Sequence, residues 1–244
     1  MVRVINFSGG KSSAYMTLML EPTADDIVLF TDTCREHPKT YEFIDNFERN
    51  EGIKIHRAVY EKDGLKGFDA LVARKANLPN VTKRTCTVEL KINTAKRYLR
   101  SLGVQRFESY IGFRADESRR VDRHKDRYKK IHTKFPMYDA GVSKKDVNDF
   151  WELKPYTLEI PSILGNCVGC FLKGPHALLQ IFEHYPEFAE PWIKDEADPI
   201  RTKGSMGNYI KGIRYADIMK KARTQSSIFD QDMQPDDTCN HCHV

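Results

Sequence analysis

The segment Asn6–Met16, NFSGGKSSAYM, joins a short apolar run to a helix-like pattern through two glycines and a lysine. A glycine-rich turn between a strand and a helix directs backbone N–H groups and the positive end of the helix dipole at an anion. Gly9 and Gly10 permit a close backbone approach, and Lys11 adds a positive charge. Three serines supply hydroxyl groups: Ser8, Ser12 and Ser13. The segment therefore predicts a phosphate-binding loop.

This loop differs from the two common phosphate-binding signatures. The pattern GxxxxGK[ST] needs a glycine where Ile5 stands, and the loop does not contain GxGxxG either. The residues by themselves also fit a tight turn capped by Ser8.

A second group of polar residues, Asp32, Thr33 and Cys34, follows the apolar run DIVLFT. Ligands of parallel sheets bind beyond the carboxyl ends of strands, so we expect Asp32 and Thr33 near the ligand. Capping of the next helix explains the same two residues equally well. Cys34 is a candidate catalytic thiol at this position.

Cysteine spacing suggests a metal site. The chain has six cysteines, and in a reducing compartment clustered cysteines serve metal binding or redox chemistry more often than disulfide formation. Cys167 with Cys170, and Cys239 with Cys242, form two CxxC pairs, and His241 and His243 lie beside the second pair. Zinc is one metal that such a set binds.

The excess positive charge of the chain lies in one segment. Arg114–Lys134 contains nine Lys or Arg and four Asp or Glu, and this difference of five equals the net charge of +5 for the whole chain. A solvated helix face or a nucleic-acid-binding surface would explain it.

Strand-like and helix-like patterns alternate around these residues. We predict strands at 2–7, 26–31, 53–59 and 107–113, with helices at 11–20, 39–50, 68–76 and 89–102. This alternation predicts an α/β fold with a parallel sheet flanked by helices. No apolar stretch is long enough to span a bilayer and no signal peptide is evident, so we expect a cytoplasmic protein without a membrane partner.

The pattern changes in the second half of the chain to short helices with Pro, Gly and Cys between them. We predict a nucleotide-binding domain at 1–150 and a small helical, cysteine-containing C-terminal subdomain at 151–244.

Several motifs resemble a known family. FSGGKSS resembles the pyrophosphate-binding PP-loop, SGGxDS, of the adenine nucleotide alpha-hydrolase superfamily. Four further segments resemble its phosphoadenosine phosphosulfate (PAPS) reductase branch, in family order: FTDTCREHPKTYEFI, KRTCTVELK, YIGFRADESRR and GNCVGCFLKG. The resemblance covers about residues 2–175 and implies a Rossmann-like (HUP-type) fold.

The resemblance also implies site residues. Arg114 and Arg120 match residues that grip the anionic end of the nucleotide, and Cys86 with Cys167 and Cys170 match ligands of a 4Fe-4S cluster. The family's cluster-binding members have a tandem cysteine pair where this chain has only Cys86. The loop has Ser12 where the superfamily usually has Asp, although its Gly-Gly-Lys is closer to the ATP-using members than to PAPS reductases.

Three functions follow as hypotheses. The first is sulfur transfer with Mg²⁺-ATP: the loop, including Lys11, binds phosphates, an acceptor oxygen is adenylylated, and sulfur from a cysteine or cluster displaces AMP. The second is reduction of PAPS or its non-phosphorylated analogue by Cys239 or Cys242, with a thiol reductant protein as partner. The third is a non-catalytic nucleotide-binding module.

Overall fold

The computed structural model describes residues 1–127, 132–204 and 207–224. Its centre is a parallel sheet, as the alternation predicts, with five strands in the order β3-β2-β1-β6-β7. The strands are β1 (Val2–Asn6), β2 (Ile27–Asp32), β3 (Ile55–Val59), β6 (Phe107–Tyr110) and β7 (Thr133–Lys134). The order reverses between β1 and β6, so a crevice is expected beyond the carboxyl ends of these two strands.

Side chains of the sheet alternate between two buried faces. Ile5 and Phe30 pack with α1 (Lys11–Met19), α2 (Pro38–Glu51) and α7 (Lys144–Glu152) in one core cluster. Val4 and Leu29 face the opposite side, where Leu99 of α4 (Thr94–Ser101) covers them. Helices therefore cover both faces of the sheet, as is usual for parallel strands.

Local sequence signals set the limits of α2. Pro38 is the first helical residue, and the His37 side chain accepts a hydrogen bond from the Lys39 backbone N–H at 3.0 Å. The helix ends at Gly52, whose φ of 67° is left-handed. Proline in the first turn and glycine after the last turn are the usual signals for where a helix begins and where it ends.

The predicted helix at 89–102 is two elements. Thr87–Asn93 (η1) is a π-helix, and α4 follows directly. The sequence pattern did not distinguish them. Wide helical turns of this kind are frequent at functional sites, and Lys91 of η1 lines a cavity described below.

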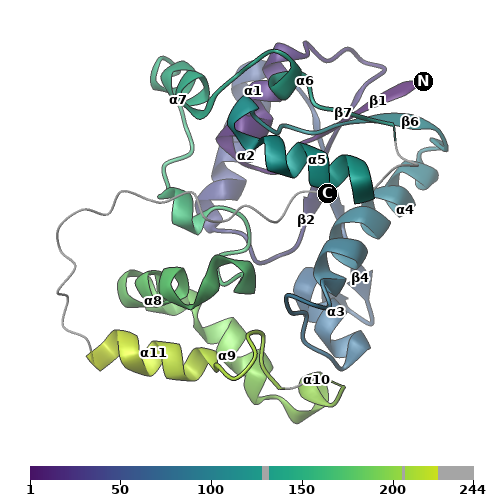
Figure 1. Cartoon of the computed structure of the whole chain (residues 1–244). Helices are drawn as coiled ribbons and strands as arrows, with labels where there is room; N and C mark the ends of the chain where they lie inside the picture. The colour runs from purple at the N-terminus through teal and green to yellow at the C-terminus, as the bar shows by residue number, and fades with distance from the viewer. Residues whose placement is uncertain (128–131, 205–206, 225–244) are drawn as a thin grey trace.

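The C-terminal helices form a separate group below the sheet in Figure 1. They are α8 (Gly174–His184), α9 (Glu190–Ala197), α10 (Pro199–Thr202) and α11 (Tyr215–Thr224). Their core also contains Phe68 and Leu71 of α3 (Gly67–Lys75) and Leu90 of η1. The helical subdomain thus shares its core with elements that precede residue 150.

Short elements complete the described chain. They are β4 (Glu61–Lys62), β5 (Leu65–Lys66), η2 (Ala115–Glu117), α5 (Ser118–Arg127), α6 (Pro136–Asp139), η3 (Ser162–Leu164), η4 (Phe171–Lys173) and η5 (Pro186–Phe188). Among the described residues, no helix is both long enough and apolar enough to cross a bilayer.

Candidate functional site

The loop between β1 and α1 has a backbone shape that requires glycine at one position. Gly9 has a φ of 79°, and a Cβ placed there would lie 2.6 Å from Thr40 Cγ2. Gly10 is the N-cap of α1, where no side chain caps the backbone and no acidic residue occupies the first turn. The positive end of α1 is therefore left open to an anion.

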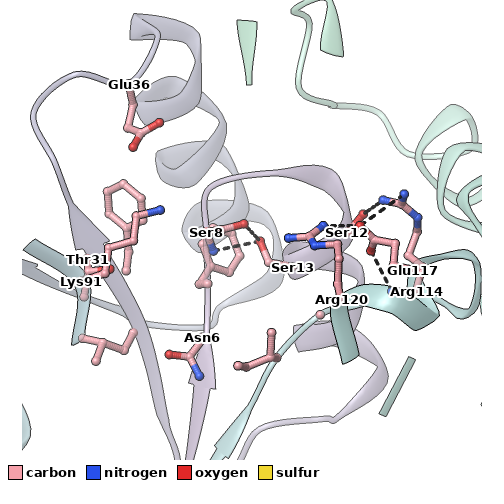
Figure 2. Close-up of a pocket in the computed structure, with 15 residues that line it drawn as sticks. Asn6, Ser8, Ser12, Ser13, Thr31, Glu36, Lys91, Arg114, Glu117 and Arg120 are labelled. Carbon is pink, nitrogen blue, oxygen red and sulfur yellow. Dashed lines mark hydrogen bonds and ion pairs between the residues drawn. The ribbon is translucent and has the colours of Figure 1, made fainter. Parts of the chain in front are cut away.

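Serine side chains hold this loop in place. The buried Ser13 hydroxyl accepts a hydrogen bond from the Ser8 backbone N–H at 3.0 Å and donates one to the Gly10 carbonyl at 2.9 Å. Its oxygen also lies 3.0 Å from Ser8 Oγ, as Figure 2 shows. Ser13 thus fixes the shape of the loop, whereas Ser12 extends toward Arg114.

Two cavities adjoin the loop. The first, which we call the sheet cavity, has a volume of about 70 Å³ and lies at the ends of β1, β2 and β6, where strand order reverses. The second, the helix cavity, has a volume of about 220 Å³ and lies between the loop, α7 and residues 158–166. Ser8, Ser12 and Arg114 line both. The loop therefore forms the boundary between them.

Arg114 and Arg120, which the resemblance assigns to the nucleotide, both line the sheet cavity. The Arg114 Nη1 group donates to Ser12 Oγ at 3.2 Å, and its other nitrogens bind the Asp116 carboxylate at 3.0 Å. The buried Glu117 carboxylate accepts from the Arg114 backbone N–H at 2.9 Å and pairs with Arg120. Carboxylates thereby orient two guanidinium groups beside the loop (Figure 2).

The sheet cavity also contains residues that the sequence did not single out for a ligand. Asn6 and Thr31 occupy or adjoin the last positions of β1 and β2, so their place at strand ends was a usable signal. The Asn6 amide donates to Ser109 Oγ and to the Tyr110 carbonyl, both at 2.9 Å, which ties β1 to β6. Glu36 arrives from the loop after β2 with no local signal.

Asp32 and Thr33, which we expect near the ligand, form hydrogen bonds within the loop after β2. Asp32 Oδ1 accepts hydrogen bonds from the Cys34 backbone N–H at 2.7 Å and from the Tyr41 hydroxyl at 2.8 Å. Thr33 is buried and bonds Glu36 at 3.0 Å. Asp32, Thr33 and Cys34 are not among the residues that line the sheet or helix cavity. The N-cap of α2 is His37 and not Asp32 or Thr33, so the hydrogen bonds of these two residues stabilise the loop itself.

The environment of Cys34 does not favour a thiolate. Cys34 is half-buried, with a left-handed φ of 58°. Burial, followed by the charge of Asp32, raises the pKa of its thiol to about 12. Because the thiolate is the nucleophile, the thiol stays protonated at neutral pH and is poorly suited to the catalytic role predicted for it.

Arg35 connects this loop to the C-terminal helices. Its side chain is 8% exposed, donates to Asp69 at 2.9 Å and Asp195 at 3.1 Å, and lies 5.3 Å from the ring centroids of Phe68 and Trp192. Asp195 is fully buried and also accepts from the Tyr209 hydroxyl at 2.7 Å. The loop after β2 is therefore an anchor for the helices.

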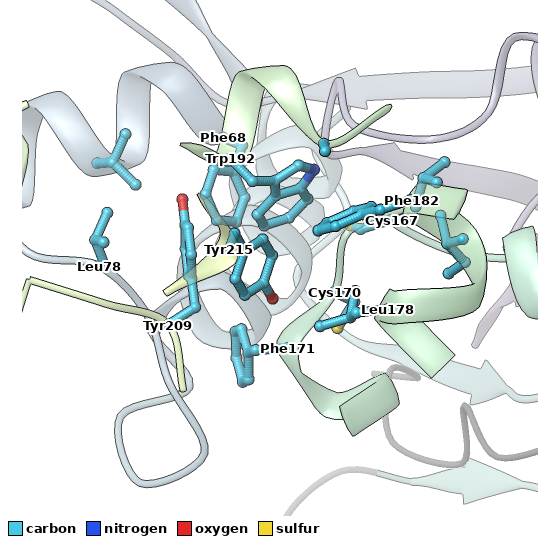
Figure 3. Packing of buried hydrophobic residues seen from close by; sticks show 14 of the residues in the cluster. Phe68, Leu78, Cys167, Cys170, Phe171, Leu178, Phe182, Trp192, Tyr209 and Tyr215 are labelled. Atoms are coloured by element: carbon cyan, nitrogen blue, oxygen red, sulfur yellow. The ribbon is translucent and has the colours of Figure 1, made fainter. Parts of the chain in front are cut away.

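Three predicted metal ligands lie in one apolar cluster. Cys167 and Cys170 are buried among Phe171, Phe182 and Tyr215, as Figure 3 shows. Cys86 packs against the same cluster. Cys167 Sγ lies 3.1 Å from Thr33 Oγ1.

A complete ligand set is not formed by these cysteines within the described residues. No group of three or more His, Cys, Asp and Glu in that part of the chain is placed to hold a metal ion. Cys239, His241, Cys242 and His243 lie outside the described residues. The 4Fe-4S cluster and the zinc alternative remain predictions.

The predicted basic surface is described only in part, because residues 128–131 fall outside the structure. In α5, His124 is buried and its ring lies 6.1 Å from Phe113 and 5.5 Å from Phe135 by centroid distance. Burial lowers the pKa of His124 to about 4. One face of this basic helix is therefore core, and nucleic-acid contact stays a prediction.

Two known proteins resemble this chain over about three quarters of its length. Over 201 residues it is 28% identical to "Uncharacterized nin region protein ORF290" of Escherichia phage lambda, covering 71% of this chain and 67% of that protein. Over 208 residues it is 26% identical to "Uncharacterized protein MJ0973" of Methanocaldococcus jannaschii, covering 77% of this chain and 46% of that protein. This chain thus spans about half the length of the archaeal relative.

The family comparison identifies the domain that contains the loop. Residues 3–156 match the phosphoadenosine phosphosulfate reductase domain. This range includes the whole parallel sheet and α7, and the helices from α8 onward follow it. The chain belongs to the phosphoadenosine phosphosulfate reductase domain family.

Proposed function

We propose that this protein binds Mg²⁺-ATP at the loop Ser8–Ser13 and catalyses adenylyl transfer coupled to sulfur transfer. The main support is the loop itself, which presents the uncapped N-terminus of α1, the Lys11 residue and the oriented Arg114 to two adjoining cavities. Anion binding by such a terminus follows from its unpaired N–H groups and dipole.

The sheet cavity suits the nucleoside part of ATP. Phe7, Leu29, Phe30 and Ile111 give it apolar walls, and Asn6, Thr31 and Lys91 supply polar groups. The charged residues Glu36, Arg114, Glu117 and Arg120 line the same cavity. Apolar walls combined with placed polar groups are typical of small-molecule sites. The α-phosphate would then lie at the boundary residues Ser8, Ser12 and Arg114.

The proposed chemistry begins at this α-phosphate. An acceptor oxygen forms a bond to the α-phosphorus, the bond to the β-phosphate oxygen breaks, and pyrophosphate leaves with the electron pair. Arg114 and the N–H groups of the loop would stabilise the charge that develops on the phosphate oxygens. Sulfide would next attack the activated atom of the acceptor, and AMP would leave with the former acceptor oxygen.

The proposal also names an acceptor and a sulfur source. A nucleic-acid base or backbone is a suitable acceptor because of the excess positive charge in Arg114–Lys134. A 4Fe-4S cluster, when bound, would supply sulfide, with Cys86, Cys167 and Cys170 as predicted ligands. Among the described residues, these three cysteines do not form a complete ligand set.

The family match favours one alternative, the reduction of a sulfonucleotide. A cysteine thiolate would attack the sulfate sulfur, the nucleotide phosphate would leave, and a second thiol would release sulfite while a disulfide forms. Cys239 and Cys242 are the predicted nucleophiles, and a thiol reductant protein would reduce the disulfide. The Gly-Gly-Lys loop makes ATP the preferred ligand in our proposal.

Equilibrium binding of Mg²⁺-ATP and PAPS to protein purified without oxygen tests the proposal. We expect tighter binding of ATP, and release of pyrophosphate when single-stranded DNA or RNA is supplied together with sulfide. Preference for PAPS, with sulfite release that Cys239→Ser plus Cys242→Ser abolishes, would instead establish the reductase. Tight ATP binding without product from either reaction would favour a non-catalytic module.

A further inference from the structure

We infer that Lys144 of α7, which lines the helix cavity beside the loop, is a specificity residue for ATP and holds the β- and γ-phosphates that the resemblance to the PP-loop places there. As a description of how ATP is selected, this inference rests on the proposed function. It assigns a specificity residue well outside the loop motif, since Lys144 lies 133 positions after Lys11 (144 − 11 = 133). It also gives a reason for choosing a triphosphate over AMP or a sulfonucleotide.

The charges of the two cavities differ in the direction that this assignment requires. Lys11, Arg114 and Lys144 line the helix cavity, and none of its described lining residues is Asp or Glu. The sheet cavity instead contains Glu36 and Glu117 together with its cations. Arg114 also pairs with Asp116, but no carboxylate lines the helix cavity itself. Two phosphates carry several negative charges, so this cavity is the more favourable one for them.

Neutral donors add to the positive charge. Ser8, Ser12 and Ser162 contribute hydroxyl groups to the helix cavity, and Asn148 and Asn166 contribute amides. Asn148 lies four residues after Lys144 in α7, so both residues project from the same side of the helix. Side chains of these types donate hydrogen bonds to phosphate oxygens.

Packing fixes α7 against the loop. The Trp151 indole N–H donates to the Lys11 carbonyl at 2.9 Å, and the Phe150 ring meets Tyr15 of α1 at a centroid distance of 5.1 Å. At the other end of α7, the Ala115 N–H donates to the Val142 carbonyl at 2.8 Å. This bond joins the turn after Arg114 to the start of α7. The three cations are therefore set on connected, well-packed elements.

Residues 162–166 form another wall of the helix cavity, and two backbone carbonyls of this segment bind a buried lysine. Lys173 is 6% exposed, and its Nζ donates to the carbonyls of Ile163 and Gly165, the latter at 2.9 Å. Carbonyl oxygens facing the cavity would repel phosphate. Since Lys173 binds two of them in the 162–166 segment, this wall is more favourable to an anion.

The boundary between the cavities lies where the chemistry requires it. Ser8, Ser12 and Arg114 line both cavities, so an α-phosphate placed there would join a nucleoside in the sheet cavity to two phosphates in the helix cavity. Breaking the bond between the α- and β-phosphates would leave AMP in one cavity and pyrophosphate in the other.

Substitution of two adjacent lysines provides a matched test. Lys144→Gln removes the cavity charge, whereas Lys145→Gln removes a charge that is 80% exposed, pairs with Asp149 and does not line the helix cavity. Calorimetry would measure Mg²⁺-ATP, AMP and inorganic pyrophosphate binding to both variants. We expect Lys144→Gln to weaken ATP and pyrophosphate binding about tenfold and AMP binding less than about twofold. Lys145→Gln should change none of them by more than about twofold.

Each result has a defined meaning. Equal weakening of AMP and ATP in Lys144→Gln, or an unchanged ATP affinity, would overturn the inference, and thermal unfolding of both variants would reveal any loss of fold. If the native protein bound no adenine nucleotide, the proposed function would fail separately. Pyrophosphate would then decide the inference: Lys144-dependent binding would support the cavity assignment, and no binding would end it.

Discussion

The loops after β1 and β2 leave neighbouring parallel strands at the same edge of the sheet, yet they serve different purposes. Ser8 and Gly9 border cavities, and the adjoining helix end is uncapped. In the loop after β2, Asp32 accepts two hydrogen bonds from its own neighbourhood and Arg35 is buried against two aromatic rings. The polar groups of Asp32 and Arg35 are thus used inside the protein, whereas Ser8 and the start of α1 border space that a ligand can enter.

Removing the buried carboxylate of Asp195 tests the anchoring side of this comparison with the largest expected effect. Asp195→Ala leaves the buried Arg35 guanidinium and the Tyr209 hydroxyl without their shared acceptor. We expect a loss of about 3–5 kcal/mol in the free energy of unfolding, measured with urea at pH 7. Asp149→Ala, which breaks an exposed ion pair, should cost less than about 1 kcal/mol. Similar losses in both variants would show that the loop after β2 is no anchor.

The comparison extends to a third segment, α5, which follows β6 and contains His124. The folded pKa of about 4 lies below the usual 6.5, so between these values the unfolded chain binds a proton that the folded chain does not. The neutral His124 therefore contributes to the free energy of unfolding. This contribution is complete above pH 6.5 and decreases by about 3 kcal/mol as the pH falls to 4. His124→Phe keeps a ring against Phe113 and Phe135 but cannot bind the proton.

The measurement is the unfolding free energy of native protein and His124→Phe at several pH values. We expect the difference between them to change in favour of the variant as the pH falls from 6.5 to 4. Curves that stay parallel would mean that His124 is not held neutral in the folded protein, and that α5 is less firmly packed than the structure shows.

Two glycine variants sharpen the ligand-binding side. Gly9→Ala places a Cβ 2.6 Å from Thr40 Cγ2 at a φ of 79°, whereas a Cβ at Gly10 would meet only Ser8 Oγ at 3.8 Å. Strain of about 1–3 kcal/mol in the loop should weaken Mg²⁺-ATP binding about 100-fold in Gly9→Ala. Gly10→Ala should lose less than about tenfold.

A further variant separates the two causes of this effect. Gly9→Ala combined with Thr40→Ala removes the closest contact but keeps the left-handed φ. Partial recovery of ATP affinity is expected, and equal affinities for Gly9→Ala and Gly10→Ala would refute the conformational requirement.

Cys34 gives the smallest expected effect. Cys34→Ser should alter Mg²⁺-ATP affinity less than about twofold, because Cys34 does not line the sheet or helix cavity. In the native protein, Cys34 should react slowly with iodoacetamide at pH 8, since burial raises its pKa to about 12. Loss of turnover in Cys34→Ser, with ATP binding intact, would return the thiol to the catalytic machinery.

The sequence predicted most of the sheet and the first loop because their signals are local. Short apolar runs define β1, β2 and β3. Two consecutive glycines before a helix pattern define the loop. The strand β7 has two residues, too few for a pattern. The π-helix before α4 contains ordinary helix-forming residues, so nothing in its spacing marked it.

Tertiary structure alone decided which polar residues face a cavity. The fate of Thr33 depends on Cys167, 134 positions later, and that of Arg35 depends on Asp195, 160 positions later. In the sequence, Lys144 is one of several charges on an amphipathic helix. Its place at the helix cavity depends on the packing of α7 beside Lys11. A chain segment encodes its own backbone shape through steric limits and hydrogen bonds, but burial and charge at a site depend on which distant segments cover it.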